Sequence, residues 1–324
     1  MEQFGALETK TQYSLLNNLD IHSLQLMCRH RGLNIRGIDK KYDLILMFIQ
    51  WYNDIKYLED KGVRGLVACE RGPRKQMEDD YILYSNGGIS LYGVFDGHGG
   101  SYISKRLRNS ITNILVPRLK VRGDLQKIIA NTFVDIDKDY YNQWRRNLFG
   151  TDGSTASIVI QKQNILYFVN LGDSRTVLYD SNGGVFYSTT DHKPANSVES
   201  ERIASTRYNV ITTDVPRIGG LLAVSRSFGD FIYKIDERDV YNPQYAVSTV
   251  PDIQRIDIST ILGDRLIVSA TDGLWDVFTN EEVYRFIQTH KKKGMAYKTI
   301  FRNLINSAYT KGSTDNISIV YVEL

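Results

Sequence analysis

The spacing of hydrophobic residues changes about 60 residues into the chain. Before that point, apolar positions such as Leu24, Met27 and Cys28 recur every three or four residues, as in an amphipathic helix. After it, apolar and polar residues alternate and glycine-containing turns become regular, as in β-strands. The change predicts a helical hairpin over residues 1–60 and a larger domain over residues 61–324.

The larger domain contains strand-like and helix-like segments in separate blocks. Strands are predicted at residues 157–160, 165–169, 176–179, 265–269 and 316–322. Helices are predicted at residues 101–115, 125–144, 281–289 and 296–309. Short turns at residues 161–164 and 181–184 would join neighbouring strands as hairpins. Hairpin-connected strands with helices in separate blocks predict a layered α+β fold rather than a parallel βαβ sheet.

Composition and charge exclude several classes of protein. The 40 basic and 37 acidic residues give a net charge of +3, too close to balance for a chain that binds polyanions along its whole length. Only Cys28 and Cys69 are present, which excludes a disulfide framework and fits a reducing compartment. The first twenty residues do not resemble a signal peptide, and no apolar run near them approaches the roughly 20 residues that span a bilayer. We therefore expect an intracellular protein of the cytoplasm or nucleus, with no membrane segment.

Aspartates occur at four predicted strand ends. Asp96, Asp173 and Asp272 follow strand-like segments, and Asp315 precedes the last one. A carboxylate at the end of a buried strand is costly unless it reaches water, a cation or a hydrogen-bond donor, and several carboxylates on one edge repel one another. A bound divalent cation removes that repulsion. The pattern therefore predicts a metal site at the edge of the sheets.

The available ligands favour a hard cation. Aspartates and backbone carbonyls suit Mg²⁺ or Mn²⁺, and the chain has no cluster of His or Cys residues for zinc. It also has no HExxH motif and no GxxxxGK[ST] loop. In the stretch DGHGG, Gly97 would let its carbonyl approach a cation beside Asp96, and His98 would be placed to give a proton to a leaving oxygen.

Nine short motifs in a fixed order resemble the metal-dependent serine/threonine protein phosphatases of type 2C. They cover residues from about 62 to 324 and are RKQMEDD (74–80), FDGHGG (95–100), DGSTAS (152–157), LGDSR (171–175), DHKP (191–194), ERI (201–203), LAVSRSFGD (222–230), SATDGLWDV (269–277) and GSTDNIS (312–318). Each motif is weak by itself, and their order is the specific signal. The resemblance implies a four-layer α-β-β-α sandwich of two mainly antiparallel sheets.

The resemblance also implies the role of each site residue. Two metal ions would be held by Asp96, the carbonyl of Gly97, Asp272 and Asp315, with Glu78 and Asp79 acting through metal-bound water. Asp173 and Asp276 would hold a third, weaker ion. Arg74 would bind the substrate phosphate, and His98 would be the general acid.

The implied activity is hydrolysis of phosphoserine and phosphothreonine in proteins. Two Mg²⁺ or Mn²⁺ ions would share a bridging water and lower its pKa, so that hydroxide attacks phosphorus in line. No cysteine nucleophile is expected, because neither cysteine lies in a phosphate-binding loop sequence. The segment from residue 191 to 220 corresponds to a flap beside the active site, where we expect substrate choice to be made.

Residues 19–51 resemble a SAP motif, a two-helix module that often binds DNA or RNA. Its hallmarks here are Leu24, the Gly32–Leu33 pair, Gly37, Lys41 and Leu44. Residues 29–41 carry five basic residues and one acidic residue, but residues 1–60 carry seven basic and eight acidic residues. That balance is poor support for binding to a phosphate backbone, so docking to a protein or a structural role is favoured over nucleic acid.

Two other functions remain open from the sequence. A pseudophosphatase would bind phosphoproteins without turnover, and loss of an aspartate ligand would mark it, whereas Asp96, Asp272 and Asp315 are all present. Alternatively, the phosphatase domain would act as a regulator tethered to nucleic acid through residues 1–60.

Overall fold

The strands of the larger domain form two antiparallel sheets that face each other. These sheets are seen in a computed structural model, which describes residues 9–30, 35, 37–45, 48, 55–60, 63–181, 184–261 and 263–324. Each of the five predicted strands and four predicted helices is present, with bounds that differ by only a few residues. Hairpin-connected antiparallel strands with helices in separate blocks confirm the layered α+β prediction.

The first sheet has six strands. In spatial order they are β1 (Ile55–Asp60), β2 (Val63–Glu70), β16 (Ile317–Glu323), β15 (Leu266–Ala270), β9 (Arg175–Tyr179) and β10 (Val185–Ser188). Their pairing is antiparallel throughout, and a register shift between Val185 and Tyr187 interrupts the pairing of β10 with β9. The last strand of the chain, β16, therefore lies in the middle of this sheet, which brings Asp315 beside the strand end that carries Asp272.

The second sheet has five strands. In spatial order they are β14 (Asp252–Asp257), β8 (Ile165–Leu171), β7 (Ala156–Lys162), β4 (Ile89–Phe95) and β3 (Asp80–Asn86). All seven residues of β4 are buried, because other layers cover both of its faces. Asp96 follows this fully buried strand directly.

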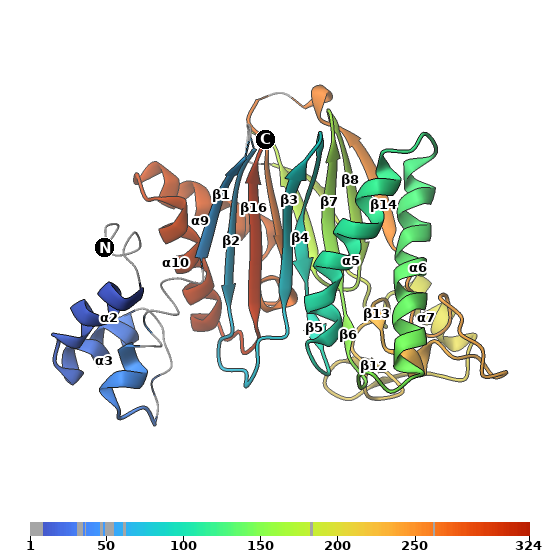
Figure 1. Ribbon diagram of the computed structural model, residues 1–324, viewed down its shortest axis with the longest axis horizontal. Coiled ribbons are helices and arrows are strands. Elements are labelled where there is room, and N and C mark those ends of the chain that lie inside the picture. Colours follow the sequence, from blue (N-terminus) through green and yellow to red (C-terminus); the bar gives the residue numbers. More distant parts are fainter. Residues whose placement is uncertain are drawn as a thin grey trace.

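Helices cover the outer face of each sheet (Figure 1). Helices α9 (Asn280–Lys292) and α10 (Tyr297–Thr310) pack on the first sheet through Ile287 and Phe301, among other residues. Helices α5 (Tyr102–Leu119) and α6 (Leu125–Trp144) pack on the second sheet. A third core, with Tyr92 and Phe168, lies where the two sheets face each other. The two sheets and these four helices thus form a four-layer α-β-β-α sandwich.

Capping residues define several helix ends. The side chain of Asp124 accepts hydrogen bonds from the backbone N–H groups of Gln126 and Lys127 at the start of α6. Helix α9 begins with a capping box between Thr279 and Glu282. These caps fix where the helices begin.

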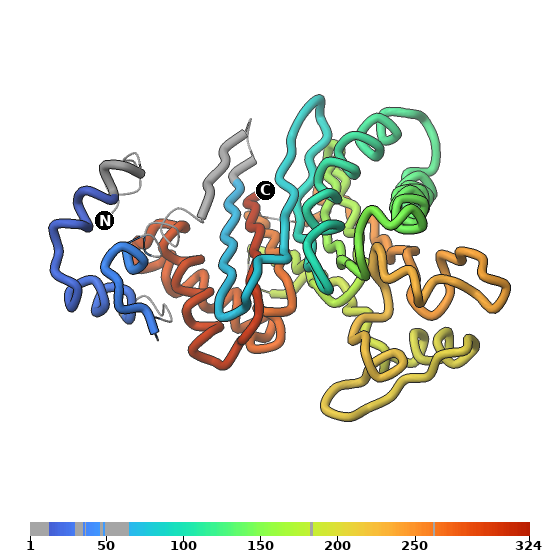
Figure 2. Tube along the Cα trace, turned by 60° about the horizontal axis from the view of Figure 1, so that its bottom comes forward, coloured from blue at the N-terminus to red at the C-terminus, as the bar shows by residue number. Residues whose placement is uncertain are grey.

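Several short elements gather at one end of the sheets (Figure 1). They are β5 (Gly97–His98), β6 (Gly153–Ser154), α7 (Ser197–Ala204), β11 (Val210–Thr212), β12 (Pro216–Ile218), β13 (Phe228–Gly229), η1 (Phe231–Tyr233) and α8 (Asp272–Trp275). The short helix η2 (Ile258–Thr260) lies elsewhere, beside the turn between β7 and β8, where the Ile258 N–H donates to the Asn164 carbonyl. Strands β5, β6 and β13 form a small sheet, and β11 and β12 form a hairpin. Figure 2 shows the segment between β10 and β14, in yellow to orange, gathered to one side of the molecule.

The N-terminal region contains α2 (Thr9–Asn17) and α3 (Ile21–His30), and residues 41–45 are also helical. Asp20 caps the start of α3, since its Oδ1 accepts a hydrogen bond from the backbone N–H of Ser23 at 2.9 Å. Leu24 and Leu44 are buried in a small core, and Lys41 donates a hydrogen bond to the carbonyl of Asn17. Gly32 and Leu33 lie outside the described residues, so the SAP-like identity stays a prediction.

The helical interpretation of residues up to 60 is wrong at its C-terminal end. Residues 55–60 form β1, which pairs with β2 from Ile55 opposite Ala68 to Asp60 opposite Val63. The strand was missed because IKYLED carries mixed polar and apolar residues that gain their strand conformation from pairing with β2. Among the described residues, no helix is both long enough and apolar enough to cross a bilayer.

Candidate metal centre

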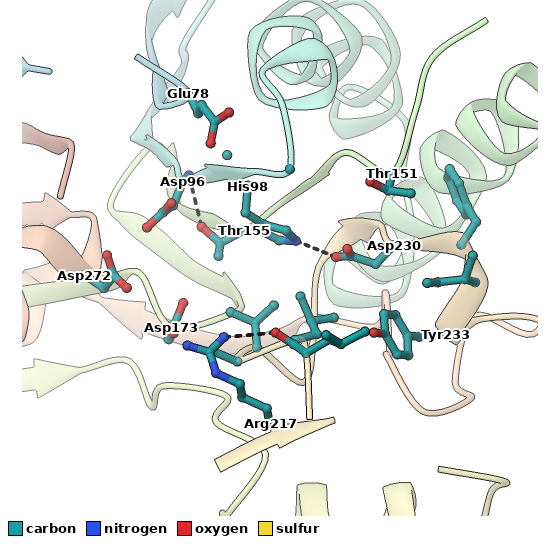
Figure 3. A pocket seen from close by; sticks show the side chains of 18 of the residues that line it. Glu78, Asp96, His98, Thr151, Thr155, Asp173, Arg217, Asp230, Tyr233 and Asp272 are labelled. Carbon is teal, nitrogen blue, oxygen red and sulfur yellow. Dashed lines mark hydrogen bonds and ion pairs between the residues drawn. The ribbon is translucent and has the colours of Figure 1, made fainter. Parts of the chain in front are cut away.

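The four strand-end aspartates line a single cavity of about 590 Å³. Its walls include Asp96, Asp173, Asp272 and Asp315, and also Arg74, Glu78, Gly97 and His98. Figure 3 shows Glu78, Asp96, His98, Asp173 and Asp272 around this space, on segments that are far apart in the sequence. The structure therefore brings together eight of the ten predicted site residues. Of the other two, Asp79 lies just behind the wall and Asp276 lies at the surface.

Asp96 is held where β4 leaves the second sheet. Its backbone N–H donates to Thr155 Oγ1 at 3.1 Å, and its carbonyl accepts from the Thr155 N–H at 2.9 Å. Gly97 then passes so close to the next segment that a Cβ there would lie 2.2 Å from the Glu78 carbonyl oxygen. Only glycine fits this close approach, which places Asp96 and Glu78 side by side.

Asp79 is held from behind by the strand that carries Asp272. The hydroxyl of Thr271 donates to Asp79 Oδ2 at 3.1 Å and accepts from the backbone N–H of Ser318 at 3.0 Å. Thr271 thereby links β15, β16 and the loop before β3. Asp272 follows it at the start of α8.

Asn316 fixes the loop that carries Arg74 and Glu78. Its Oδ1 accepts from the Glu78 N–H at 2.9 Å, and its Nδ2 donates to the carbonyls of Arg71 at 2.8 Å and Gln76 at 3.1 Å. The sequence interpretation named Asp315 and not its neighbour. The sequence did contain a signal for Asn316, because an asparagine directly before a buried strand can form side-chain hydrogen bonds to backbone N–H and C=O groups of a loop.

Burial and mutual repulsion raise the pKa values of the clustered carboxyls. Burial, together with the nearby Asp272 carboxylate, raises the pKa of Asp173 to about 8 and that of Asp96 well above its usual range. Burial also raises the pKa of Asp79 to about 8 and, with repulsion from Asp276, that of Asp272 to about 6. These aspartates are therefore poorly stabilised as anions by the protein alone.

The donor set fits a hard divalent cation. The Oδ1 atom of Asp173 is buried without a hydrogen-bond partner, and among the described residues Asp96, Asp173 and Asp272 form no salt bridge. Within the same part of the chain, no three His, Cys, Asp or Glu side chains converge tightly enough to hold one ion by themselves. An ion here would need the Gly97 carbonyl and water as further ligands, which is how Mg²⁺ is usually bound.

Lys193 supplies a positive charge at the rim of the cluster. Its Nζ lies 3.4 Å from Asp276 Oδ1, and its charge also opposes the rise in the pKa of Asp173. The side chain of Asp276 is 60% exposed and does not line the cavity. Lys193 thus interacts with both Asp173 and Asp276, the two residues predicted to hold a third ion. This lysine was not among the predicted site residues.

His98 contacts a buried aspartate that was also missed. Its Nε2 lies 2.7 Å from Asp230 Oδ2, and the hydroxyl of Ser227 donates to the same oxygen at 2.5 Å. Burial lowers the pKa of His98, but Asp230 outweighs it, so the pKa is raised above its usual value. Asp230 has a φ of 51°, a left-handed conformation that a local pattern does not reveal.

Arg74 reaches the cavity while held at its edge. Its Nη2 pairs with Asp315 Oδ2 at 2.5 Å and its Nε donates to the Thr314 carbonyl at 3.3 Å. The side chain is 53% exposed, so N–H groups remain available to an incoming anion.

The raised pKa values predict how stability depends on pH without metal. A group whose pKa is raised on folding holds extra protons in the folded state, so its contribution is present below the unfolded value and lost as pH rises through the folded value. Asp272, Asp79 and Asp173 place this window between about pH 4 and 8. In EDTA, the free energy of unfolding should fall across that range by about 1.4 kcal/mol per pH unit for each excess proton. Urea unfolding at pH 5 and pH 8, with EDTA or Mn²⁺, measures this. A fall that Mn²⁺ does not reduce would contradict the site.

Replacing Asn316 by alanine should destabilise the protein by about 2–3 kcal/mol, because it removes three hydrogen bonds at about 1 kcal/mol each. The rate of turnover should also fall by more than the loss of folded protein accounts for, because the loop that carries Arg74 and Glu78 is no longer held in place. Urea unfolding and steady-state kinetics measure the two effects. The matched control Asn164→Ala, at an exposed turn, should change stability by less than about 0.5 kcal/mol. Equal effects of the two substitutions would show that Asn316 does not anchor the loop.

Comparison with known proteins identifies the family. The family model described as protein phosphatase 2C matches residues 64–317. The chain is 34% identical over 257 residues to probable protein phosphatase 2C 7 of Oryza sativa, covering 78% of this chain and 63% of that protein. It is 31% identical over 305 residues to the human integrin-linked kinase-associated serine/threonine phosphatase 2C, covering 81% of this chain and 73% of that protein.

Solved structures agree on the fold. A phosphatase from Toxoplasma gondii superposes with a TM-score of 0.71 at 22% identity, covering 83% of this chain and 94% of the other. A sex-determining protein of C. elegans superposes with a TM-score of 0.70 at 21% identity, covering 88% and 71%. The chain spans somewhat less than two thirds of the rice relative, and the range of the family match includes every residue that lines the cavity. The chain therefore belongs to the protein phosphatase 2C family.

Proposed function

We propose that the chain is a metal-dependent protein serine/threonine phosphatase. The observation that carries this proposal is a set of buried and partly buried carboxylates, with an exposed arginine and a histidine, around one open cavity. Such a set attracts divalent cations, and cations beside an arginine attract a phosphate group. Membership of the family supports the same activity.

The residues that would hold the ions are those at the strand ends. Asp96, the Gly97 carbonyl, Asp272 and Asp315 would bind two Mg²⁺ or Mn²⁺ ions directly, and Glu78 and Asp79 would act through water. When bound, the ions would neutralise the phosphate and lower the pKa of a water that attacks phosphorus. Asp173 and Asp276 would take a third, weaker ion, in exchange for the charge of Lys193.

The protein's own side chains would position the substrate and its leaving group. Arg74, fixed by Asp315 and the Thr314 carbonyl, would present its remaining N–H groups to two phosphate oxygens. His98, whose ring is fixed by Asp230, would give a proton to the departing serine or threonine oxygen. The Asp230 carboxylate raises the pKa of His98, which favours the protonated imidazole that a general acid requires.

The experiment that tests this proposal is hydrolysis of a phosphothreonine peptide. We expect phosphate release with Mn²⁺ and at least a 100-fold lower rate in EDTA, because the carboxylates alone would repel the substrate. Restoring Mn²⁺ should restore the rate. Equal rates in EDTA and Mn²⁺ would exclude a metal-dependent mechanism. Tight binding of the phosphopeptide with no turnover would favour a phosphoprotein-binding pseudoenzyme instead.

Residues 1–60 would serve for docking, and a protein is favoured over a nucleic acid as the partner. Lys41 is tied to the Asn17 carbonyl, so part of the positive charge near residue 40 serves the helical packing. A location in the cytoplasm or nucleus would suit either partner. A gel shift of the full chain against duplex DNA and RNA at physiological salt separates the two, because a nucleic-acid role requires retardation that salt weakens.

A further inference from the structure

The cavity that holds the carboxylates extends to an apolar wall. Leu221 and Ile232 line the same space, and these residues are 73% and 41% exposed. Trp144, the last residue of α6, also lines it. Large apolar side chains that remain exposed in a functional cavity are candidates for contact with a ligand.

Hydrogen bonds hold the turn that carries Leu221. Gly219 and Gly220 have φ angles of 58° and 76°, which favour glycine, and they reverse the chain after β12. The Ile218 N–H donates to the Leu222 carbonyl at 2.8 Å, and Arg217 Nη1 donates to the Leu221 carbonyl at 2.9 Å. Figure 3 shows Arg217 rising from the flap hairpin with its guanidinium group on the side of Asp173. The backbone of Leu221 is thus fixed from both sides while its side chain stays exposed.

The backbone of Ile232 is fixed in a similar way. The hydroxyl of Tyr208, on the flap, donates to the Ile232 carbonyl at 2.9 Å. Its neighbour Phe231 is buried and packs with Trp144, the ring centroids lying 5.7 Å apart. Ile232 therefore directly follows a residue that is fixed in an aromatic cluster. Neither it nor Leu221 would need to order its backbone to bind a ligand, which removes a usual cost of association.

A side chain that contacts this apolar wall would belong to the same peptide as the phosphorylated residue, because the cavity is short. A volume of about 590 Å³ corresponds to a space roughly 8 Å across, the length of two to three residues of an extended peptide. A phosphate at the carboxylate end would therefore place a neighbouring side chain against the wall. The acidic residues Glu78, Asp230 and Asp173 that line the cavity disfavour an acidic neighbour.

We propose that Leu221 and Ile232 form an apolar shelf that selects phosphopeptides with a large apolar side chain within two residues of the phosphoserine or phosphothreonine. This inference rests on the proposed function in one respect, namely that the ligand is a phosphopeptide. Burial of one such side chain against a partly open pocket corresponds to a preference of about tenfold. The positive charge of Arg217, which also lines the cavity, would instead favour an acidic side chain beside the phosphorylated residue. The test therefore includes peptides with Asp.

The test uses phosphothreonine peptides in which one position, from two residues before to two residues after the phosphothreonine, carries Leu, Ser or Asp. With Mn²⁺, we expect the Leu peptide at one position to show about tenfold higher kcat/KM than the Ser peptide. Leu221→Ser and Ile232→Ser should each bring that ratio close to 1. The matched control Val198→Ser, at an exposed position of α7 outside the cavity, should preserve it. Melting temperatures of all three variants show that they fold.

Binding of the same peptides by fluorescence anisotropy separates the shelf from catalysis. If the wild type binds the Leu peptide about tenfold more tightly but hydrolyses none, the shelf stands and the phosphatase proposal fails. If the wild type hydrolyses the Leu and Ser peptides equally at every position, the shelf is excluded and the phosphatase stands. Preference for Asp, or a ratio unchanged in both Ser variants, also overturns the shelf.

Discussion

Asp272→Ala is expected to lower kcat/KM for a phosphothreonine peptide by about 10³-fold in Mn²⁺. Asp272 lies at the centre of the carboxylate cluster, since its charge raises the pKa values of Asp79, Asp96 and Asp173 alike. Its loss should weaken cation binding, which supplies several kcal/mol of transition-state stabilisation, and each 1.36 kcal/mol is a factor of ten in rate. Initial rates of phosphate release measure the effect.

Two further variants make that experiment specific. Asp272→Asn keeps the shape and loses the charge, so it should be nearly as impaired as alanine. Asp135→Asn removes a carboxylate of α6 that is 54% exposed and pairs with Arg118, and it should retain at least half of the wild-type rate. In EDTA, Asp272→Ala should be more stable than the wild type near pH 8, because repulsion within the cluster is relieved. Wild-type turnover by Asp272→Ala would remove this residue from the metal site.

Lys234→Met is expected to destabilise the protein by about 3–5 kcal/mol, because it leaves a buried carboxylate without its cation. Lys234 and Asp137 are both fully buried and lie 2.8 Å apart. Asp137 also accepts hydrogen bonds from the Gly229 N–H and from the hydroxyls of Tyr241 and Thr249. The pair therefore ties α6 to the segment that carries Asp230 and Ile232. Urea unfolding with Mn²⁺ present measures the loss.

A control and a double variant isolate the buried charge. Lys127→Met, at a lysine side chain that is 82% exposed, should change the free energy of unfolding by less than about 0.5 kcal/mol. Adding Asp137→Leu to Lys234→Met should recover part of the stability, since no unpaired charge then remains buried. If Lys234→Met and Lys127→Met unfold at the same urea concentration, the pair does not hold this segment.

The layers and the cluster of aspartates could be predicted from the sequence because each depends on a local pattern. Alternation located the strands, and a helical period located the four helices that cover them. The position of Asp96, Asp173, Asp272 and Asp315 at strand ends required only that the ends share one edge. The cavity that these four line agrees with that expectation, while the roles assigned to them stay predictions.

The residues that were missed depend on contacts distant in the sequence. Asn316 acts on carbonyls about 240 positions away, and His98 meets Asp230 across 132 positions. No spacing rule reveals such pairs. Strand β1 was interpreted as helical for a related reason, because its conformation depends on the edge of β2. Asp276 fell outside the cavity because α8 turns its carboxylate towards Lys193 and solvent.

Carboxylates from distant segments of the chain meet at one cavity, where we propose that they bind divalent cations. Anomalous diffraction from crystals grown with Mn²⁺ tests this binding most directly, since the signal locates manganese without reference to the protein atoms. We expect anomalous density in the cavity, within bonding distance of Asp96 and Asp272. Crystals that show no density there at saturating Mn²⁺, with the four strand-end aspartates ordered, would contradict it.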